Sequence, residues 1–416
     1  MSNERTWDVV VVGGGPAGLA AAMAAQKAGA HRVLLVERDS RLGGILPQCI
    51  HPGFGLHRYG KELTGPEYAH LDIQQMSQSN IQCMMDTCVT RIIPHENHID
   101  IRLMRRGMLE TTTAHAVVLA MGCRERTAGA ISLAGTRPAG IFTAGTAQRL
   151  VNLQNILPGK NVVIAGSGDI GLIMARRMSL EGAKVHAVTE IMPYAGGLAR
   201  NLNQCLVDYG IPLLLSTKVV RVYGQHRLEG VRIAPLRPDG TVQADAQQDI
   251  PCDTLLLSVG LLPENELSRQ AGILIDSATG GPSVDARCMT SKPGVFACGN
   301  ALHVHDVADY VSEEAELAGK SAALHALEES GIRDQIPVRH GPQFRYVLPQ
   351  KITPAIETTL SLRVGKPINR CQILVVQGGK RIHRENHIRL MPSEMLRIPV
   401  KFLSKGEVEV LCEERD

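Results

Sequence analysis

Hydrophobic and polar positions along the chain predict short strands and helices in a repeated order. Two apolar runs, VVVV at residues 9–12 and VVIA at 162–165, each lead directly into a Gly-x-Gly-x-x-Gly turn and a helical segment rich in alanine or methionine. A second apolar run, HRVLLVE or KVHAVTE, follows each helix and ends in Glu37 or Glu190. Continuous apolar runs of this length are typical of strands buried on both faces of a parallel sheet. The pattern therefore predicts one strand–helix–strand unit used twice.

The pattern changes between and after these units. Residues 43–69 are rich in Gly and Pro and predict a long loop until about Pro66, and such loops inside compact domains are usually functional. Further strands are expected at 88–93, 98–103, 116–122 and 252–260, and helices at 140–157 and 309–327. From about 342 to 414 the chain has no helical period, which predicts a β-sandwich or β-barrel module of about 75 residues.

Composition and charge narrow the class of protein. At 416 residues the chain is long enough for two or three domains, and 44% hydrophobic residues supply large cores. Its 44 basic and 41 acidic residues give a net charge of +3, which offers no electrostatic reason to expect nucleic acid. No apolar run approaches the roughly 20 residues of a membrane span, and the start MSNERTWD is too polar for a secretory signal. A cytoplasmic location is therefore expected.

The ten cysteines are expected to be reduced thiols, most of them small buried residues. No pair has the spacing Cys-x-x-Cys. Neither a zinc or iron–sulfur site nor a redox-active dithiol is therefore predicted.

The two glycine turns indicate dinucleotide binding, because each glycine has a physical role. The first allows the tight turn, the second lets the backbone approach a pyrophosphate, and the third lets the helix pack on the strand. The helix N-terminus offers free amide groups to the phosphates. Glu37 and Glu190 are placed to accept hydrogen bonds from a ribose hydroxyl, and Glu190 would repel a 2′-phosphate, which favours NAD over NADP. Structural turns in an ordinary α/β sheet are the alternative interpretation.

The order of segments resembles the pyridine nucleotide-disulfide oxidoreductase superfamily and its thioredoxin-reductase-like branch. The resemblance implies an α/β fold with two Rossmann-like dinucleotide-binding domains, FAD in the first and NAD(P)H in the second, followed here by the small all-β module. Residues 1–140 and 261–335 are expected to form a discontinuous FAD domain, 141–260 the inserted NAD domain and 340–416 the β module. A third family signature resembles residues 120–122 and recurs at 258–260, and Gly299-Asn300 resembles the Gly-Asp that contacts the flavin ribityl chain.

The motifs and the resemblance together predict two sets of cofactor-binding residues. For FAD they are Gly13, Gly15, Pro16, Ala17, Gly18, Glu37, Arg38, Gly44, Val89, Ala120, Met121, Gly122, Gly299 and Asn300. For NAD they are Gly166, Gly168, Asp169, Ile170, Gly171, Glu190 and Gly260. Ile173 and Met174 stand where thioredoxin-reductase-like members often have glutamates. The resemblance also includes a relative that holds ATP in this pocket, and it therefore implies another adenine nucleotide such as ATP as the alternative occupant of the second site.

A closer resemblance covers nearly the whole chain and rests on segments such as GGILPQCIHPGFG, MGCRERTAG and RPAGIFTAGTAQRLVN. They are similar to bacterial flavoproteins encoded beside glycerol-3-phosphate dehydrogenases. They are more distantly similar to α-type subunits of opine oxidases, hydrogen cyanide synthase and dye-linked proline dehydrogenases. This resemblance implies that the chain has a second flavoprotein dehydrogenase chain for a partner, with a small iron–sulfur protein as a further one, and that it forms an oligomer.

The long loop contains the candidate catalytic residues. Cys49 lies where single-cysteine relatives keep a redox thiol near the flavin, and His51 or a helix N-terminus would stabilise its thiolate. His51, His57 and Tyr59 are also candidates for donating protons to the flavin or to a small substrate. Packing within the loop is the plainer interpretation of these residues.

A second group of polar residues follows Gly299-Asn300. His303, His305, Asp306 and Asp309 include residue types that bind metals, but no metal is expected. We instead expect Asp306 or Asp309 to cap the long helix that begins near residue 309, whose N-terminus would face the flavin.

The expected function is FAD-dependent oxidoreduction, in which hydride or electrons pass between NAD(H) and a partner acceptor. The chain is expected to be the electron-transfer component of a multi-subunit dehydrogenase acting on a polyol phosphate, a hydroxy acid or an amino acid. The alternative is a stand-alone NADH:acceptor reductase, or a peroxide, persulfide or disulfide reductase that uses Cys49.

Overall fold

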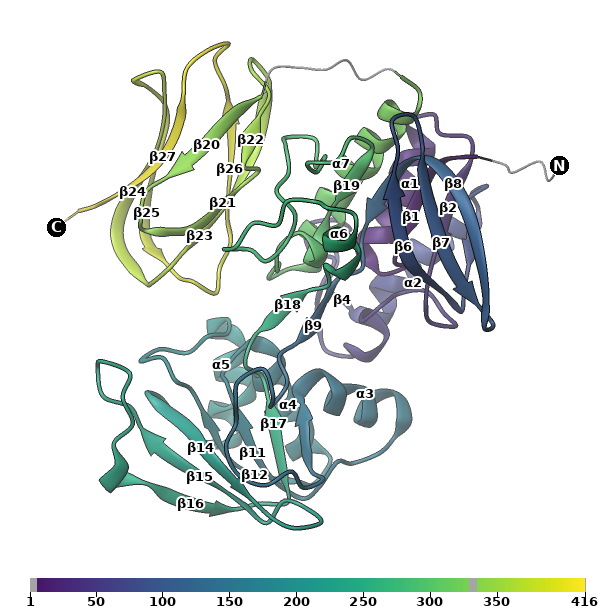
Figure 1. Cartoon of the computed structure of the whole chain (residues 1–416). Helices are drawn as coiled ribbons and strands as arrows, with labels where there is room; N and C mark the ends of the chain where they lie inside the picture. Colours follow the sequence, from purple (N-terminus) through teal and green to yellow (C-terminus); the bar gives the residue numbers. More distant parts are fainter. Residues whose placement is uncertain (1–5, 329–334, 416) are drawn as a thin grey trace. The chain divides into compact units, whose positions relative to one another are not determined.

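The computed structural model describes residues 6–328 and 335–415, which fall into two compact units. The first unit comprises Met1–Pro47, Pro52–Cys123 and Pro263–Asp416, and the second comprises Gln48–His51 and Arg124–Leu262. Parallel sheets in both units and an all-β module at the end of the chain confirm the predicted α/β class (Figure 1). Among the described residues, no helix is both long and apolar enough to cross a membrane.

The first unit is built on a seven-stranded sheet. Its parallel strands are β5 (Gln82–Met84), β2 (Val33–Val36), β1 (Trp7–Val12), β8 (Met108–Leu119) and β19 (Val295–Ala297). Two antiparallel strands, β7 (Ile99–Arg105) and β6 (Thr87–Pro94), continue the sheet from the first half of β8. Val9, Val10 and Val11 are completely buried in β1, as expected for a central strand covered on both faces.

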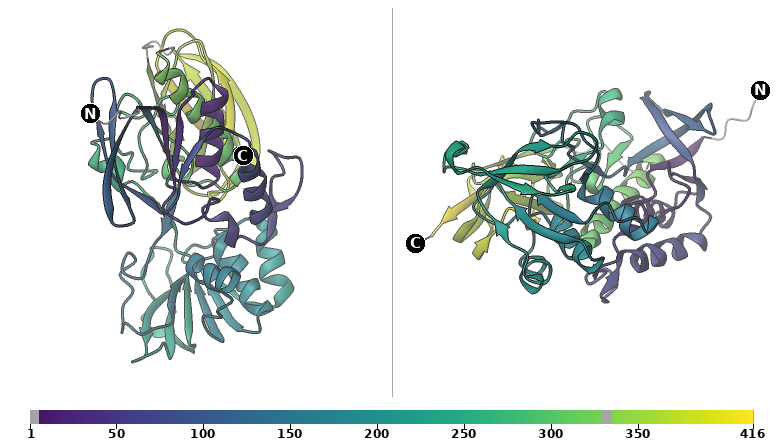
Figure 2. Two further views of the ribbon diagram at one scale, coloured as in Figure 1. Left: turned by 90° about the vertical axis from the view of Figure 1, so that its right-hand side faces the viewer. Right: turned by 90° about the horizontal axis from the view of Figure 1, so that it is seen from below.

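Helices α1 (Pro16–Lys27) and α7 (Ala308–Ala326) lie side by side on this sheet (Figures 1 and 2). A Cβ atom on Gly319 would lie 2.0 Å from the carbonyl oxygen of Ala21, so glycine is needed where the two helices meet. The third long helix, α2 (Gly65–Ser77), begins with a capping box between Thr64 and Glu67. The shorter elements are η1 (Leu46–Gln48), β3 (Pro52–Phe54), β4 (Leu63–Thr64), α6 (Glu266–Gln270) and η4 (Gly299–Ala301).

The second unit has a five-stranded parallel sheet and a three-stranded antiparallel sheet. The parallel order is β10 (Ile141–Thr143), β17 (Thr254–Leu257), β11 (Asn161–Ala165), β12 (Lys184–Thr189) and β13 (Leu213–Leu214). The helices are α3 (Ala144–Gln154), α4 (Asp169–Leu180) and α5 (Ala199–Cys205), with η2 (Val207–Tyr209) and η3 (Ala244–Ala246). The antiparallel strands are β14 (Thr217–Tyr223), β15 (Gly230–Pro235) and β16 (Gln248–Pro251), and β9 (Cys123–Glu125) pairs with β18 (Leu261–Pro263).

Residues 124–140 pack within the second unit, whereas the domain boundary expected from sequence lies at 140. Leu133 is buried in a core cluster with Val163, and Gly135 forms a β-bridge with Val222. This segment has few large apolar residues, so its sequence did not indicate whether it packs against the core of the first unit or that of the second.

The β module consists of two sheets that enclose one apolar core. One has the order β22 (Lys351–Ile352), β20 (Ile336–His340), β27 (Val408–Glu414), β24 (Ile368–Gln377) and β25 (Lys380–Leu390). The other has the order β21 (Phe344–Leu348), β23 (Glu357–Val364) and β26 (Leu396–Lys401). The β-type runs expected at 344–352, 358–368, 371–379, 395–403 and 407–414 contain all these strands except two. The sequence did not predict β20, which lies before residue 342, or β25, a polar strand at the edge of its sheet.

Candidate dinucleotide-binding sites

The first glycine turn has a backbone that other residues could not adopt. Gly13 has φ +106°, and a Cβ atom there would lie 2.5 Å from the carbonyl oxygen of Ala120. A Cβ atom on Gly18 would lie 1.7 Å from the carbonyl oxygen of Gly13. The turn is therefore pressed against the end of β8 on one side and against helix α1 on the other, as its motif predicts.

Glu37 holds this turn from the end of β2. Its carboxylate is buried and accepts hydrogen bonds from the backbone N–H groups of Gly14, at 2.6 Å, and Asp39, at 2.8 Å. Arg38, the next residue, is exposed. Glu37, the predicted ribose acceptor, therefore also fixes the backbone of the glycine turn and the backbone that follows β2.

The space before helix α1 fits a dinucleotide. Gly15 is the N-cap and no side chain caps this helix, so its first amide groups remain available for phosphate oxygens. A Cβ atom on Gly15 would meet only Gly44, at 3.7 Å, and one on Gly122 would meet nothing within 4 Å. Pro16 and Ala17 form the first turn of α1, and Met121 precedes Gly122. Val89 is buried in β6, and its contact with FAD stays a prediction.

The second glycine turn repeats this geometry. Gly166 has φ +96°, and its Cβ atom would lie 2.0 Å from the carbonyl oxygen of Ser258. Glu190 is buried and accepts hydrogen bonds from Ser167, at 3.0 Å from the backbone N and 2.6 Å from Oγ, and from the Met192 backbone N at 2.9 Å. Helix α4 begins at the N-cap Gly168, again without a side-chain cap. The motif thus forms a second turn of the same geometry.

The remaining residues predicted for NAD surround this second turn. Asp169 and Ile170 lie in the first turn of α4, and the Gly171 backbone N donates to Ser258 Oγ at 3.1 Å. Asp169 Oδ1 accepts hydrogen bonds from the Leu198 backbone and from Asn201, so its carboxylate is already used within the protein. Gly260 follows β17 with φ +103°.

The turn at Gly299 and Asn300 is held by helix α7. Glu314 Oε1 accepts a hydrogen bond from the Gly299 backbone N at 2.7 Å, and Glu314 Oε2 lies 2.8 Å from Nε2 of His303. Asn300 Oδ1 accepts from the His305 backbone N at 3.0 Å. The side chain of Asn300 is therefore part of the turn's own hydrogen bonding, and its predicted contact with the ribityl chain stays a proposal.

Burial and hydrogen bonding set the charges in this cluster. Burial lowers the pKa of His303 to about 4, so the imidazole is neutral near pH 7. Burial alone would raise the pKa of Glu314, but His303 and His305 hold it well below its usual range. Ligand atoms of His303, His305 and Glu314 lie within 4.8 Å of one another, as do those of His95, His98 and Asp100. In the first group the His303 N–H to Glu314 hydrogen bond accounts for the short distance without an ion.

The expected cap of helix α7 is wrong. The N-cap is Val307, and no side chain caps the helix. Asp306 instead pairs with Arg363 of β23 at 2.5 Å, and Asp309 accepts hydrogen bonds from the backbone N–H groups of Gly55 and Arg58. Asp306 is bonded to a guanidinium and Asp309 to two backbone amides of the loop, so neither carboxylate bonds the N-terminus of the helix.

Arg363 connects the β module to the Gly299 turn. Its Nε donates to the hydroxyl of Tyr346 at 3.0 Å, and that hydroxyl lies 3.4 Å from Nδ1 of His303. Because His303 donates Nε2–H to Glu314, its Nδ1 is free to accept the Tyr346 proton. A continuous chain of hydrogen bonds therefore runs from Arg363 through Tyr346 and His303 to Glu314.

The long loop is fixed more firmly than its sequence suggests. Tyr59 donates to Asp72 at 2.6 Å, and Arg58 pairs with the same buried carboxylate at 3.2 Å. His57 stacks on Tyr310 with ring centroids 5.0 Å apart. These contacts support the packing interpretation of His57 and Tyr59.

Cys49 and His51 belong to the second unit. The thiol of Cys49 donates to Gln148 Oε1 at 3.7 Å, and burial raises its pKa to about 12. A thiol with this pKa stays protonated at neutral pH and is a poor nucleophile. His51, two residues further along the chain, is partly buried, and its role in proton transfer stays a prediction.

Some residues that fix the turns described above were not predicted. Glu314 and Arg363 had no signal in the sequence, because the residues that they contact lie 11 to 59 positions away along the chain. The glycine pairs at 43–44 and 196–197, by contrast, follow Glu37 and Glu190 at the same distance, so this repeat could be recognised in the sequence. Of these four glycines only Gly44 was predicted.

Comparisons with known proteins agree with this geometry. The pyridine nucleotide-disulphide oxidoreductase family matches residues 7–322. The HcnB component of hydrogen cyanide synthase from Pseudomonas protegens is 28% identical over 360 residues, which cover 78% of this chain and 71% of that protein. An opine oxidase component of Agrobacterium tumefaciens is 25% identical, over 78% of this chain and 66% of that protein. The ferredoxin reductase component of chlorobenzene dioxygenase from Cupriavidus is 27% identical, over 79% and 77%.

Solved structures show the same fold. Thioredoxin reductase of T. acidophilum has a TM-score of 0.62 and 24% identity, over 78% of this chain and 99% of that one. A NAD-dependent persulfide reductase from A. fulgidus has a TM-score of 0.59 and 18% identity, over 95% and 72%. With two glycine turns, two buried acids and a family match that covers most of the sequence, the chain belongs to the pyridine nucleotide-disulphide oxidoreductase family and has FAD and a nicotinamide nucleotide as its cofactors.

Proposed function

We propose that the chain is the NAD(H)-dependent, FAD-binding electron-transfer subunit of a larger dehydrogenase. The observation that carries this proposal is the second glycine turn, which has the same buried acid and uncapped helix as the first. FAD, when bound, supplies hydride acceptance and stepwise electron release. The chain's own residues bind and orient the two nucleotides through Glu37, Glu190 and the two helix N-termini.

Three relatives support the partner part of the proposal. By name they are components of a hydrogen cyanide synthase, of an opine oxidase and of a dioxygenase that has a ferredoxin reductase. The β module lies beyond the matched family region and offers a surface for a second flavoprotein subunit or a small iron–sulfur protein. A polyol phosphate, a hydroxy acid or an amino acid is the proposed substrate class, and the cytoplasm the proposed location.

A stand-alone NADH:acceptor reductase is the alternative. A Cys49-dependent reductase is disfavoured by the protonated thiol, which lacks the thiolate that such chemistry needs.

The test combines co-purification with anaerobic spectroscopy. The chain is expressed with its genomic neighbours, the yellow complex is isolated, and NADH or NADPH is added without oxygen. We expect NADH to bleach the flavin band and a second flavoprotein chain to co-elute. A chain that elutes alone and reduces dyes at full rate would support the stand-alone reductase instead.

A further inference from the structure

Two histidines and one aspartate lie together at the tip of the β6–β7 hairpin. His95 and His98 are the first and last residues of the four-residue turn that joins β6 to β7, and Asp100 is the second residue of β7. The His95 backbone N donates to the His98 carbonyl at 2.8 Å, which closes the turn. The three side chains therefore come from a short segment whose backbone is fixed.

The register of the hairpin places Asp100 on its outer face. Ile99 and Ile101 are buried in the core of the first unit. Because successive side chains of a strand point to opposite faces, Asp100 points away from that core. Asp100 pairs with Ile93 across the hairpin, one step from the turn. The buried isoleucines thus hold the carboxylate close to the two imidazoles.

The polar atoms of the three side chains are close enough to share one ion. His95 Nε2 lies 3.1 Å from Asp100 Oδ2, and His98 Nε2 lies 3.4 Å from Asp100 Oδ1. The two imidazole rings are stacked, with centroids 4.6 Å apart. In a tetrahedral zinc site with bonds of about 2.0–2.2 Å, neighbouring ligand atoms are separated by about 3.3–3.6 Å. The separations of the imidazole nitrogens from the carboxylate oxygens are close to this value.

The hairpin group differs from the group around His303 in its access to solvent. His303 is completely buried, and protein groups lie within hydrogen-bonding distance of both of its ring nitrogens. The side chains of the hairpin group are 29–45% exposed. A metal ion can therefore reach the hairpin group, and water can occupy the coordination positions that the protein leaves open.

A hollow of about 710 Å³ lies at the turn. It is lined by residues 94–98 of the hairpin and by Ala271, Lys292 and Pro293 of the same unit. Glu96 and Asp100 contribute two negative charges to this region and Lys292 contributes one positive charge, so with neutral imidazoles the net charge is −1. The hollow has room for a hydrated ion, and its charge favours a cation.

We propose that His95, His98 and Asp100 bind one divalent transition-metal ion, Zn²⁺. Imidazole and carboxylate are both zinc ligands, whereas Mg²⁺ and Ca²⁺ prefer sites made of oxygen atoms. The cysteine spacing argues against a zinc site made of thiolates and does not bear on imidazoles. Three protein ligands leave one tetrahedral position for water. The ion would join the end of β6 to β7 at the edge of the seven-stranded sheet.

The test is calorimetric titration of the FAD-loaded, chelator-treated protein with Zn²⁺. We expect one ion to bind at the hairpin with a dissociation constant of about 10 μM or lower. Anomalous scattering at the zinc absorption edge from soaked crystals should place this ion between the three side chains. His95→Gln and Asp100→Asn should each weaken binding by about tenfold or more, since removal of a group that only orients a ligand already has an effect of this size.

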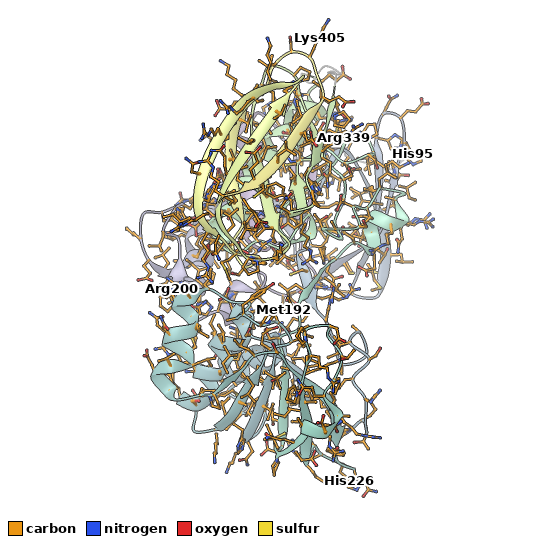
Figure 3. The ribbon with its side chains drawn as sticks, turned by 90° about the vertical axis from the view of Figure 1, so that its left-hand side faces the viewer. His95, Met192, Arg200, His226, Arg339 and Lys405 are labelled. Atoms are coloured by element: carbon orange, nitrogen blue, oxygen red, sulfur yellow. The ribbon has the colours of Figure 1, made fainter. Side chains whose placement is uncertain are left out.

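His226→Gln is the matched control, because His226 is an exposed residue of the turn between β14 and β15 and has no neighbouring histidine in the sequence. His95 and His226 are both labelled in Figure 3. The control should bind Zn²⁺ as the unmodified protein does. The inference is overturned if His95→Gln or Asp100→Asn binds Zn²⁺ as tightly as the control, or if the unmodified protein binds no Zn²⁺ in this range. Flavin reduction by NADH does not involve this hairpin, so the proposed function stands or falls separately.

Discussion

Glu314 of helix α7 accepts a hydrogen bond from the backbone amide of Gly299 at 2.7 Å, and this contact fixes the turn that we predict to contact the flavin. The other oxygen of Glu314 takes the N–H of His303, a residue with no exposed surface. One carboxylate therefore satisfies two donors that water does not reach easily.

Replacing Glu314 should separate loss of charge from loss of hydrogen bonding. Glu314→Ala leaves the Gly299 amide and the His303 N–H without their acceptor, so we expect the free energy of unfolding to fall by about 2–4 kcal/mol and FAD to bind more weakly. Glu314→Gln keeps one acceptor oxygen and should cost less than half as much. Urea denaturation and FAD content measure both effects, and equal losses in the two variants would contradict this role.

His303 should make the protein sensitive to acid. Its pKa is lowered to about 4 in the folded state, against about 6.5 in an unfolded chain. Between these values the unfolded chain binds a proton that the folded chain does not, so stability falls as the pH drops from about 6.5 to 4, by up to about 3 kcal/mol. His303→Gln should flatten this part of the stability profile, measured by denaturation at a series of pH values. His31→Gln, at an exposed position, is the control and should leave the slope unchanged.

Cys49→Ser should have little effect. The thiol is protonated at neutral pH and donates to Gln148, and serine can make the same hydrogen bond in nearly the same volume. FAD content and NADH-dependent dye reduction are expected to stay within a few-fold of the unmodified protein. A loss of more than about a hundredfold in turnover with FAD still bound, equivalent to about 2.7 kcal/mol, would instead assign the thiol to the chemistry.

Glu190 should set the choice between nicotinamide nucleotides. The residues that follow it, Ile191 to Tyr194, include no basic side chain to bind a 2′-phosphate. NADH should reduce the flavin faster than NADPH in anaerobic stopped-flow experiments, and Glu190→Ala should narrow the difference. Equal rates for the two nucleotides in the unmodified protein would remove the argument.

Much of the geometry of both glycine turns was predictable because the determinants are local in sequence. Each turn, its helix and its acid lie within 25 residues, and steric contacts such as that of Gly18 with the Gly13 carbonyl allow few alternatives. The parallel strands were equally clear, because burial on both faces leaves continuous apolar runs.

Two predictions failed for different physical reasons. Aspartate is a residue type that often caps helices, but Arg363 lies close enough in the fold to form an ion pair with the Asp306 carboxylate. Strand β25 was missed because alternating charged and polar residues are tolerated at a sheet edge, where one side of the strand needs no partner. Neither outcome follows from neighbouring residues.

Arg363 gives the β module a role in the cohesion of the first unit. The side chain is largely buried, and it bonds Asp306, the Val304 carbonyl and Tyr346 together. Deleting the chain from residue 336 onward would leave the Asp306 carboxylate without its ion pair and the polar groups around His303 without some of their partners. The first unit therefore needs the β module for its stability. The turn at Gly299 and Asn300 and the β module should consequently unfold together in one cooperative transition.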